Sequence, residues 1–355
     1  MSATDSETAQ AAAKTSRRAE PGMRGFRDFR STLRESSTQP RPPGCAKLPV
    51  VIRRYHRRRY LAAALFSALL AAPYALALFA TDLRPSIKER PQNIAHRGAS
   101  ARAPENTMEA FQLAREAGAG VLEMDLQMTR DGRIVVIHDE TLDRTTDSSG
   151  AVSDKSFEEL RAIDAGHAFT PGGIPDEGPL PSGERVYRDS GVRVPEFSAV
   201  LEEFPEMRLN VEIKADVPGI ERAVLQEIRR AGAGDRVLVA SHEHSVIRRF
   251  REVSGGETET AASVREVVRF YALSALRLEG LANPPYDALQ IPVERRGLTL
   301  ASPRMIEAAH GRGVRVDVWT IDDPSEMRRL LDLGADAIIT NRPAELQEVL
   351  DKRNG

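Results

Sequence analysis

Short apolar runs alternate with amphipathic segments along the chain from residue 92 onward. The apolar runs are rich in Val, Ile and Leu, which is typical of buried strands. We therefore expect strands at 93–96, 121–128, 133–139, 208–214, 236–242, 257–263, 288–293, 315–321 and 336–340. Between most of these runs the apolar positions recur every three or four residues, which is a helical spacing. It predicts helices at 107–118, 218–232, 243–253, 303–312 and 324–333.

The repeated order of strand and helix predicts a parallel sheet, and this many units over residues 92–350 favour a closed (β/α)8 TIM barrel. An open doubly wound sheet is the alternative, but the sequence has no Gly-rich phosphate-binding or dinucleotide-binding fingerprint. Nine candidate strands are one more than a barrel needs. The second and third are joined by "TRDGR", so we expect an antiparallel hairpin with a two-residue turn at Asp131-Gly132. That register would place Asp125 directly opposite His138.

Residues 139–195 interrupt the alternation with a turn-rich stretch. It is too long for an ordinary barrel loop, so we expect a small inserted subdomain beside the top of the barrel. One short helix is expected within it, at about residues 157–163. The pattern does not define element boundaries within residues 254–285.

The N-terminal part of the chain differs from the barrel in its pattern. Residues 1–50 are polar, basic and without apolar periodicity, which indicates a disordered tail. Residues 51–80 combine a basic flank, with five arginines at 53–59, and 20 uncharged residues at 61–80. This length matches one bilayer crossing, and the arginines predict a cytoplasmic N-terminus. Residues 81–91 would link this helix to the barrel.

We accordingly expect a single-pass protein of the cell membrane with an extracytoplasmic catalytic domain. A signal peptide cleaved near Ala75-Leu76-Ala77, giving a secreted protein, is an alternative, although the preceding basic region is long for one. A buried core helix is the third alternative.

The charge distribution narrows the classes of partner. Residues 1–60 hold 14 Lys and Arg against 5 Asp and Glu, whereas residues 81–355 hold 36 against 47. An acidic body argues against binding to nucleic acid. Cys45 is the single cysteine, so no internal disulfide can form. No protein partner is indicated by the sequence.

Three carboxylates lie on two of the predicted strands. Glu123 and Asp125 are two positions apart and so point to one face, and Glu212 lies in the apolar run "NVEIK". A carboxylate inside a parallel sheet is costly unless it is paired or bound to metal. Converging carboxylates suit a hard cation such as Mg²⁺ or Ca²⁺. Salt bridges with Arg97 and Lys214 are the alternative explanation.

Two histidines end predicted strands, and catalytic groups of barrels lie at strand ends. His96 closes "NIAH" and His138 closes "RIVVIH", and together they could act as acid and base in a phosphoryl displacement. Arg97 and Lys214 could hold a phosphate. His242 and His244 also follow a strand and could reach the barrel mouth.

The segment that follows His96 reads as a turn into a helix. Gly98 permits a tight turn and Pro104 stiffens it. Asn106 is expected to cap the helix, with Glu109 completing an arrangement similar to a capping box. Glu105 could bond a catalytic group or favour the helix N-terminus.

With these residues identified, the sequence resembles the glycerophosphodiester phosphodiesterase family. The resemblance rests on "AHRGASARAPENTMEAF", "GAGVLEMDLQMTRDGRIVVIHDETLDRTTDSSG", "RLNVEIK" and "VRVDVWTIDDPSEMRRLLDLGADAIITNRP", which occur in family order over about 92–345. It implies a TIM barrel with a small insertion and a bound divalent ion, Mg²⁺ or Ca²⁺. It implies that Glu123, Asp125 and Glu212 are metal ligands and that His96 and His138 are the catalytic histidines. It also implies that Arg97 and Lys214 contact the phosphate, that Glu105 is a supporting carboxylate and that Trp319 is an aromatic pocket wall.

The resemblance implies metal-dependent hydrolysis of a small glycerophosphodiester to glycerol 3-phosphate and an alcohol. A membrane-anchored phosphodiesterase that cleaves lysophospholipids in the manner of a lysophospholipase D is a second hypothesis. A non-catalytic phosphodiester-binding module is a third. The sequence departs from the family pattern at Asn341, where Asp is common, and at Phe197-Ser198-Ala199, where Thr-Leu-Glu is frequent. We assign neither position a part in the chemistry.

Overall fold

A computed structural model describes residues 92–173 and 182–354, together with Tyr60 and Ser67. The predicted tail at 1–50, the linker at 81–91 and nearly all of the apolar segment at 61–80 lie outside the described residues. Within the described part of the chain, no helix combines the length and the apolar character that a bilayer crossing requires. The proposed membrane segment therefore stays a prediction.

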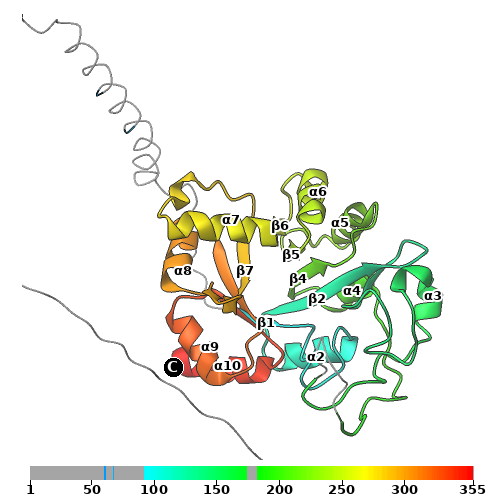
Figure 1. Ribbon diagram of the computed structural model, residues 1–355. Helices are drawn as coiled ribbons and strands as arrows, with labels where there is room; N and C mark the ends of the chain where they lie inside the picture. The colour runs from blue at the N-terminus through cyan, green and yellow to red at the C-terminus, as the bar shows by residue number, and fades with distance from the viewer. Residues whose placement is uncertain (1–59, 61–66, 68–91, 174–181, 355) are drawn as a thin grey trace, which may run out of the picture. The chain divides into compact units, whose positions relative to one another are not determined.

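Eight parallel strands form the barrel, as the sequence pattern predicts (Figure 1). They are β1 (Gln92–Ala95), β2 (Val121–Met128), β4 (Arg208–Ile213), β5 (Val237–Ala240), β6 (Glu259–Thr260), β7 (Ala288–Pro292), β10 (Arg315–Trp319) and β11 (Ala337–Thr340). Each pairs with the next of these strands, and β1 pairs with β11 in register Gln92↔Ala337. Between β6 and β7 the contact is a single parallel bridge, Ala261↔Ala288, which closes the barrel.

Helices surround the sheet and bury one apolar stripe each against it. They are α2 (Met108–Glu116), α4 (Phe197–Glu203), α5 (Ile220–Arg230), α6 (His244–Ser254), α7 (Val264–Ala275), α8 (Pro303–His310), α9 (Pro324–Asp332) and α10 (Pro343–Asn354). In α5, for example, Ile220, Val224 and Ile228 are fully buried and recur every four residues. Proline at the first helical position starts α8 and α9, each behind a capping side chain, Ser302 or Asp323.

The apolar core has two main parts. One lies around β2, β4, α5 and α6, and includes the buried rings of Phe111, Phe204 and Phe250. The other lies around β10, α8, α9 and α10. Phe111 and Phe204 meet edge to face at 6.3 Å, which fixes α2 against the end of α4. The strands are therefore held by packing on the outside of the barrel, and their C-terminal ends remain free for polar side chains.

The additional predicted strand, the one expected at 133–139, is β3 (Ile134–Val136). It pairs antiparallel with β2 outside the barrel ring. The predicted turn is wrong by one residue. Thr129 bonds Arg133, so the loop has three residues and Gly132 takes a positive φ of 78°. The one-residue shift places Ile137 opposite Asp125, with a bond from Ile137 N to Asp125 O of 2.9 Å. His138 therefore does not face Asp125 directly, as the two-residue turn required.

The insertion has its own small core, as predicted. Leu142, Val152, Leu160 and Val194 pack with the outer face of β3, and α3 (Phe157–Leu160) lies where a short helix was expected. Ser156 caps α3 with a full capping box. A 3₁₀ turn, η1 (Val152–Asp154), precedes it.

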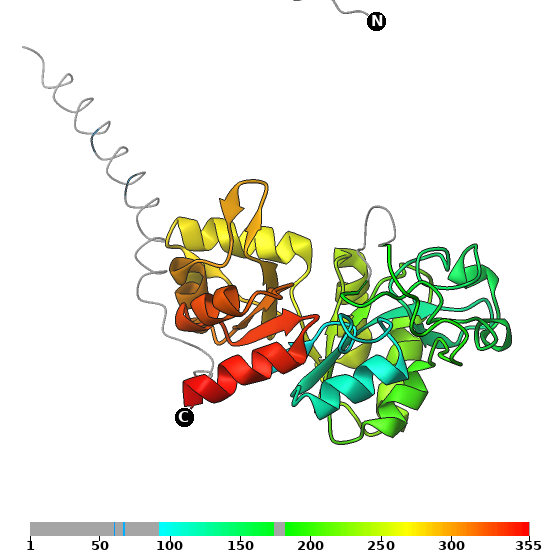
Figure 2. The same ribbon diagram turned by 90° about the horizontal axis from the view of Figure 1, so that it is seen from below.

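Residues 254–285, where the pattern did not define the boundaries, contain β6 within the strand predicted at 257–263. Helix α7 and a second 3₁₀ turn, η2 (Glu279–Leu281), follow it. After β7 the chain makes a small hairpin of β8 (Glu294–Arg295) and β9 (Leu298–Thr299). Arg296 and Gly297 both have positive φ, which is the geometry of a type I′ turn. Figure 2 shows this hairpin standing out from the barrel beside α7.

Candidate active site

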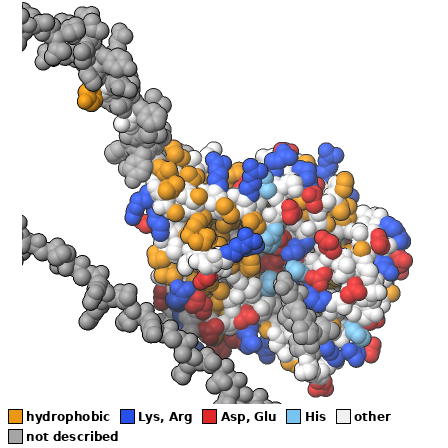
Figure 3. Space-filling model, viewed as in Figure 1, with side chains coloured by type: hydrophobic (Ala, Val, Ile, Leu, Met, Phe, Trp, Pro, Cys, Tyr) orange, Lys and Arg blue, Asp and Glu red, His pale blue; other side chains and the backbone are white. Residues whose placement is uncertain are grey.

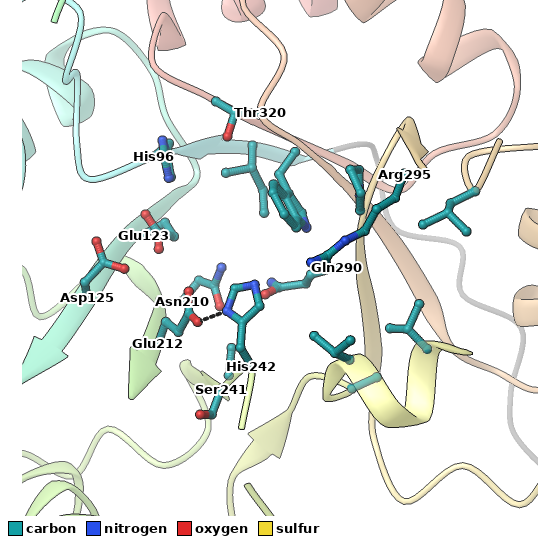
Figure 4. A pocket seen from close by; sticks show the side chains of 18 of the residues that line it. His96, Glu123, Asp125, Asn210, Glu212, Ser241, His242, Gln290, Arg295 and Thr320 are labelled. Carbon is teal, nitrogen blue, oxygen red and sulfur yellow. Dashed lines mark hydrogen bonds and ion pairs between the residues drawn. The ribbon is translucent and has the colours of Figure 1, made fainter. Parts of the chain in front are cut away.

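A cavity of about 600 Å³ opens at the C-terminal ends of the barrel strands. All the residues predicted to contact metal or substrate line this cavity. They are His96, Arg97, Glu123, Asp125, His138, Glu212, Lys214 and Trp319. Figure 4 shows the carboxylates and His96 on one side of the space, with Gln290 and Arg295 across from them. The remaining predicted residue, Glu105, does not line the cavity but bonds Arg97, which does.

The three carboxylates converge because of strand register. Asp125 of β2 is the direct neighbour of Glu212 in β4, and Glu123 lies two positions before Asp125. Side chains two apart on a strand share a face, so all three point into the barrel mouth. One oxygen from each lies within 4.8 Å of the others.

The pKa values of these three closely spaced acids shift in different directions. Burial, and then the Asp125 carboxylate, raise the pKa of Glu123 well above its ordinary value. Burial acts on Asp125 as well, but Arg97 and Lys214 outweigh it and lower the pKa of Asp125. For Glu212, a hydrogen bond from His242 and the charge of Lys214 outweigh burial and lower its pKa.

The donor set fits a divalent metal ion. Its atoms are all carboxylate oxygens, the ligands that Mg²⁺ and Ca²⁺ prefer. Burial first, and the negative charge of Asp125 second, disfavour the charged form of Glu123 despite the nearby charge of Arg97. A bound cation would favour that charged form.

The two predicted cations are both tied to these acids. Arg97 Nε lies 3.0 Å from Asp125 Oδ2, and its backbone N–H donates to Glu123 Oε2 at 2.7 Å. Lys214 Nζ lies 3.5 Å from Asp125 and 3.4 Å from Glu212. Burial alone would lower the pKa of Lys214, but the two carboxylates raise it. The salt bridges that the sequence left as an alternative are therefore present, alongside an arrangement that fits a metal.

His96 is oriented by Asn341, for which we predicted no part in the chemistry. The Asn341 amide nitrogen donates to Asp322 Oδ2 at 2.8 Å, so its oxygen faces His96 Nδ1 at 2.7 Å. Because that oxygen only accepts, His96 Nδ1 carries hydrogen and Nε2 is the basic nitrogen of the ring. Ser100 Oγ adds a contact of 2.8 Å to the same oxygen.

His138 is oriented by a carboxylate in the same way. His138 Nδ1 lies 2.6 Å from Asp139 Oδ1, and Arg144 Nε donates to Asp139 Oδ2 at 2.7 Å. Burial would raise the pKa of Asp139, but these two bonds lower it to about 2. Arg144 also bonds Glu105, which in turn lies 3.0 Å from Arg97. Glu105 therefore connects the turn after β1 to the start of the insertion.

The role predicted for Asn106 is wrong. Thr107 caps α2 instead, and its side chain accepts from Ala110 N. Asn106 has a positive φ of 58°, and its amide bonds Asp125 on both sides: Nδ2 donates to Oδ2 at 2.9 Å and Oδ1 accepts from Asp125 N at 3.2 Å. Its short polar side chain tolerates this backbone conformation, which turns the amide back toward β2. Asn106 thus supports Asp125 from the side away from Lys214.

The opposite side of the cavity is apolar and aromatic. Its members come from α7, the β8–β9 hairpin and β10, and are Ala262, Val264, Val267, Val268, Tyr271, Leu298, Leu300 and Trp319. The Trp319 ring packs edge to face with His242 at 6.1 Å and also against the core residues Ile94 and Ile339. Trp319 therefore lines the cavity and also packs against core residues.

Some contacting residues could be found from the sequence and others could not. Asp139 directly follows the histidine that closes an apolar run, and His242 ends the strand predicted at 236–242, so position alone gives a signal. Asn341 and Asp322 give none, because their role depends on the pairing of β11 with β1 and of β10 with β11. His242 bonds Glu212 directly, which raises the pKa of His242.

Comparisons with known proteins agree with this geometry. Residues 96–345 match the model of the glycerophosphoryl diester phosphodiesterase family. A glycerophosphodiester phosphodiesterase of Caldanaerobacter subterraneus is 33% identical over 266 residues, which span 73% of this chain and 97% of that protein. A human lysophospholipase D is 26% identical over 79% of this chain and 93% of its own length.

Among solved structures, a phosphodiesterase of Oleispira antarctica in complex with sn-glycerol-3-phosphate aligns with a TM-score of 0.58 at 24% identity. It covers 74% of this chain and 97% of its own. The family match at residues 96–345 thus spans nearly all of the barrel, the whole insertion and every predicted site residue. The chain belongs to the glycerophosphoryl diester phosphodiesterase family.

Proposed function

We propose that this chain hydrolyses glycerophosphodiesters to glycerol 3-phosphate and an alcohol. The observation that carries the proposal is the convergence of Glu123, Asp125 and Glu212 in a cavity also lined by two oriented histidines. In this proposal the three carboxylates hold one divalent ion, Mg²⁺ or Ca²⁺. When bound, such an ion polarises phosphoryl oxygens and lowers the pKa of a coordinated hydroxyl.

The chain's own residues would carry the proton transfers. His96 and His138 each have Nδ1 engaged by a fixed acceptor, at 2.7 and 2.6 Å, so Nε2 is the atom that exchanges a proton. One histidine would take the proton of the attacking hydroxyl and the other would protonate the leaving alkoxide. Lys214 and Arg97 would offset the charge of the phosphodiester, with Lys214 the more accessible of the two.

The test is turnover by the barrel fragment, residues 81–355. This fragment contains residues 96–345, which match the family model, and 73% of this chain covers 97% of the Caldanaerobacter relative, so that relative consists of little more than the barrel. We expect release of glycerol 3-phosphate from glycerophosphocholine, loss of activity with chelator, and recovery with Mg²⁺ or Ca²⁺. His138→Ala or Glu123→Ala with full activity would refute the site, provided that both variants melt as cooperatively as the parent.

A lysophospholipid is the second candidate substrate, and the apolar cavity wall favours it. That wall lies across the cavity from the carboxylates and offers Val267, Tyr271 and Leu300 to an alkyl chain. Within the described residues, this apolar surface comes from α7 and the β8–β9 hairpin and not from the insertion. Glycerophosphocholine and lysophosphatidylcholine, assayed side by side, would separate the two substrates.

The localisation is also a proposal. Residues 61–80 would span the cell membrane once, with the N-terminus cytoplasmic and the barrel extracytoplasmic. Protease added to intact cells should then remove the barrel and leave the N-terminal tail protected. Release of the barrel into the medium, with a new N-terminus near residue 78, would instead establish signal cleavage.

A further inference from the structure

Large apolar side chains are exposed together beside the cavity. Val264 and Val268 on α7 are 38% and 62% exposed, Leu276 at the C-cap of α7 is 64% exposed, and Leu298 on the hairpin is 52% exposed. We call these four residues the docking face. Figure 3 shows hydrophobic side chains gathered over α7 and the neighbouring hairpin, next to the histidines of the cavity.

The sequence of α7 explains why these side chains point outward. Val264 and Val268 are four residues apart and so lie on one side of the helix, and Leu276 is the residue that caps its C-terminus. The side that packs on the barrel is formed by Phe270 and Ser274, which are buried. Helix α7 is therefore apolar on a second side that the barrel does not cover.

This apolar surface is continuous with the cavity wall. Val264, Val268 and Leu298 line the cavity and are also exposed to solvent. The hairpin adds to this continuity, because Arg295 and Leu298 pair across its two strands and share one side. An amphiphile lying on the docking face would therefore reach the cavity without crossing a polar rim at this side.

Arginines flank the docking face. Arg265 and Arg269 are exposed on α7, and Arg295 and Arg296 are exposed at the hairpin tip. The acidic group of α7, Glu266, is turned away into a bond of 2.7 Å with Arg251. Exposed apolar side chains bordered by cations are the pattern of a surface that lies in the headgroup region of an anionic bilayer.

We propose that the docking face binds the surface of an anionic lipid bilayer. Val264, Val268 and Leu298 enter the headgroup layer, and the flanking arginines contact lipid phosphates. The mouth of the cavity then opens at the membrane surface. This binding is independent of the proposed hydrolysis, and only its use in delivering lipid substrates rests on that function.

The linker is long enough to allow this orientation. Residues 81–91 can span at most about 38 Å if fully extended. The longest barrel strand, β2, has eight residues and so rises about 26 Å. A chain anchored at 61–80 could therefore pass the side of the barrel and leave its mouth turned toward the same bilayer.

The test is co-sedimentation of the barrel fragment, residues 81–355, with vesicles and no substrate. Vesicles of phosphatidylcholine alone are compared with vesicles of phosphatidylcholine and phosphatidylglycerol in equal parts. We expect binding to the anionic vesicles that weakens as salt is added. Val268→Asp and Leu276→Asp should each weaken it about fivefold to tenfold, because an apolar contact becomes a charge that anionic lipid repels. The matched control is Val186→Asp, since Val186 is 48% exposed but lies in the insertion.

The outcomes separate the two proposals. Binding that Leu276→Asp weakens and Val186→Asp does not supports the docking face, whether or not glycerophosphocholine is hydrolysed. Equal binding by all three variants and the parent, or no binding to either vesicle, overturns it. A fragment that is dimeric without lipid, and becomes monomeric on Leu276→Asp, would identify the face as a contact between copies of the chain and would also overturn the proposal.

Discussion

Replacement of Glu123 by Gln should make the metal-free barrel more stable while it abolishes metal binding. Oxygens of the three acids lie within 4.8 Å of one another. At an effective dielectric constant of about 20, two charges at that distance repel by about 3 kcal/mol. Arg97 offsets part of this, so we expect Glu123→Gln to gain about 1–3 kcal/mol in the free energy of unfolding. The Gln oxygen can still accept the 2.7 Å bond from the Arg97 backbone.

The gain should depend on pH with a defined sign. The pKa of Glu123 is raised in the folded protein, by burial first and by Asp125 second. The folded state therefore holds its proton over a range in which the unfolded state has lost it, and the stability of the parent protein falls as pH rises through that range. The Gln variant cannot titrate there. Its advantage should be near zero below the ordinary pKa of Glu, about 4.3, and should grow as pH rises.

Chemical denaturation in chelator, at several pH values, measures the gain. A saturating divalent ion at about 100 times its Kd should stabilise the parent by about 2.7 kcal/mol and the variant by far less. The matched control is Glu266→Gln. Hydrogen bonds from Arg251 and Ser263 lower the pKa of Glu266 despite its burial, so this change should cost about 1 kcal/mol. A Glu123→Gln barrel that is less stable than the parent in chelator at pH 8, or that keeps the metal response, would refute the reasoning.

Other expected outcomes concern orientation, backbone and titration. Asn341→Leu removes the acceptor of His96 Nδ1, and we expect kcat/KM to fall about tenfold to a hundredfold with a displaced pH–rate profile; an unchanged profile would contradict an orienting role. Gly98→Ala should cost about 3 kcal/mol or more, because the new Cβ would lie 2.6 Å from backbone. Gly132→Ala, with a similar φ and open space, should cost about 1 kcal/mol, and equal melting temperatures for the two would contradict this account. A hydrogen bond to a carboxylate raises the pKa of His310, so its contribution to stability is full below about pH 6.5 and is lost as pH rises through the folded pKa; denaturation of His310→Gln from pH 6 to 9 should give a flatter profile.

Strand order and the main site residues could be predicted because each depends on local pattern. Glu123 and Asp125 interrupt an apolar run, and His96 ends one, so burial and strand ends were both visible in the sequence. Parallel strands bring such ends to one edge of the barrel. The register of β2 against β4 then places Asp125 directly beside Glu212.

What could not be predicted depends on single-residue register or on distant partners. The turn after β2 has three residues because Gly132 takes a positive φ, and a sequence with Asp-Gly is compatible with either length. Asn106 resembles a helix cap by type and position, but its positive φ turns its amide to Asp125. Asn341 lies 245 residues from His96, so only the packing of β11 against β1 shows that they touch.

The site residues are unevenly distributed along the chain. The acids, both oriented histidines and the two cations come from residues 96–214, whereas the apolar wall comes from residues 262–319. In the sheet, β5 and β6 lie between the two stretches on one side, and β11 and β1 lie between them on the other. Inherited changes in the later stretch can therefore alter which alcohol or lipid is accepted without disturbing the earlier one. The substrate specificity of such an enzyme can change while its catalytic residues stay the same. Exchange of residues 262–300 between relatives is therefore the natural route to new substrates.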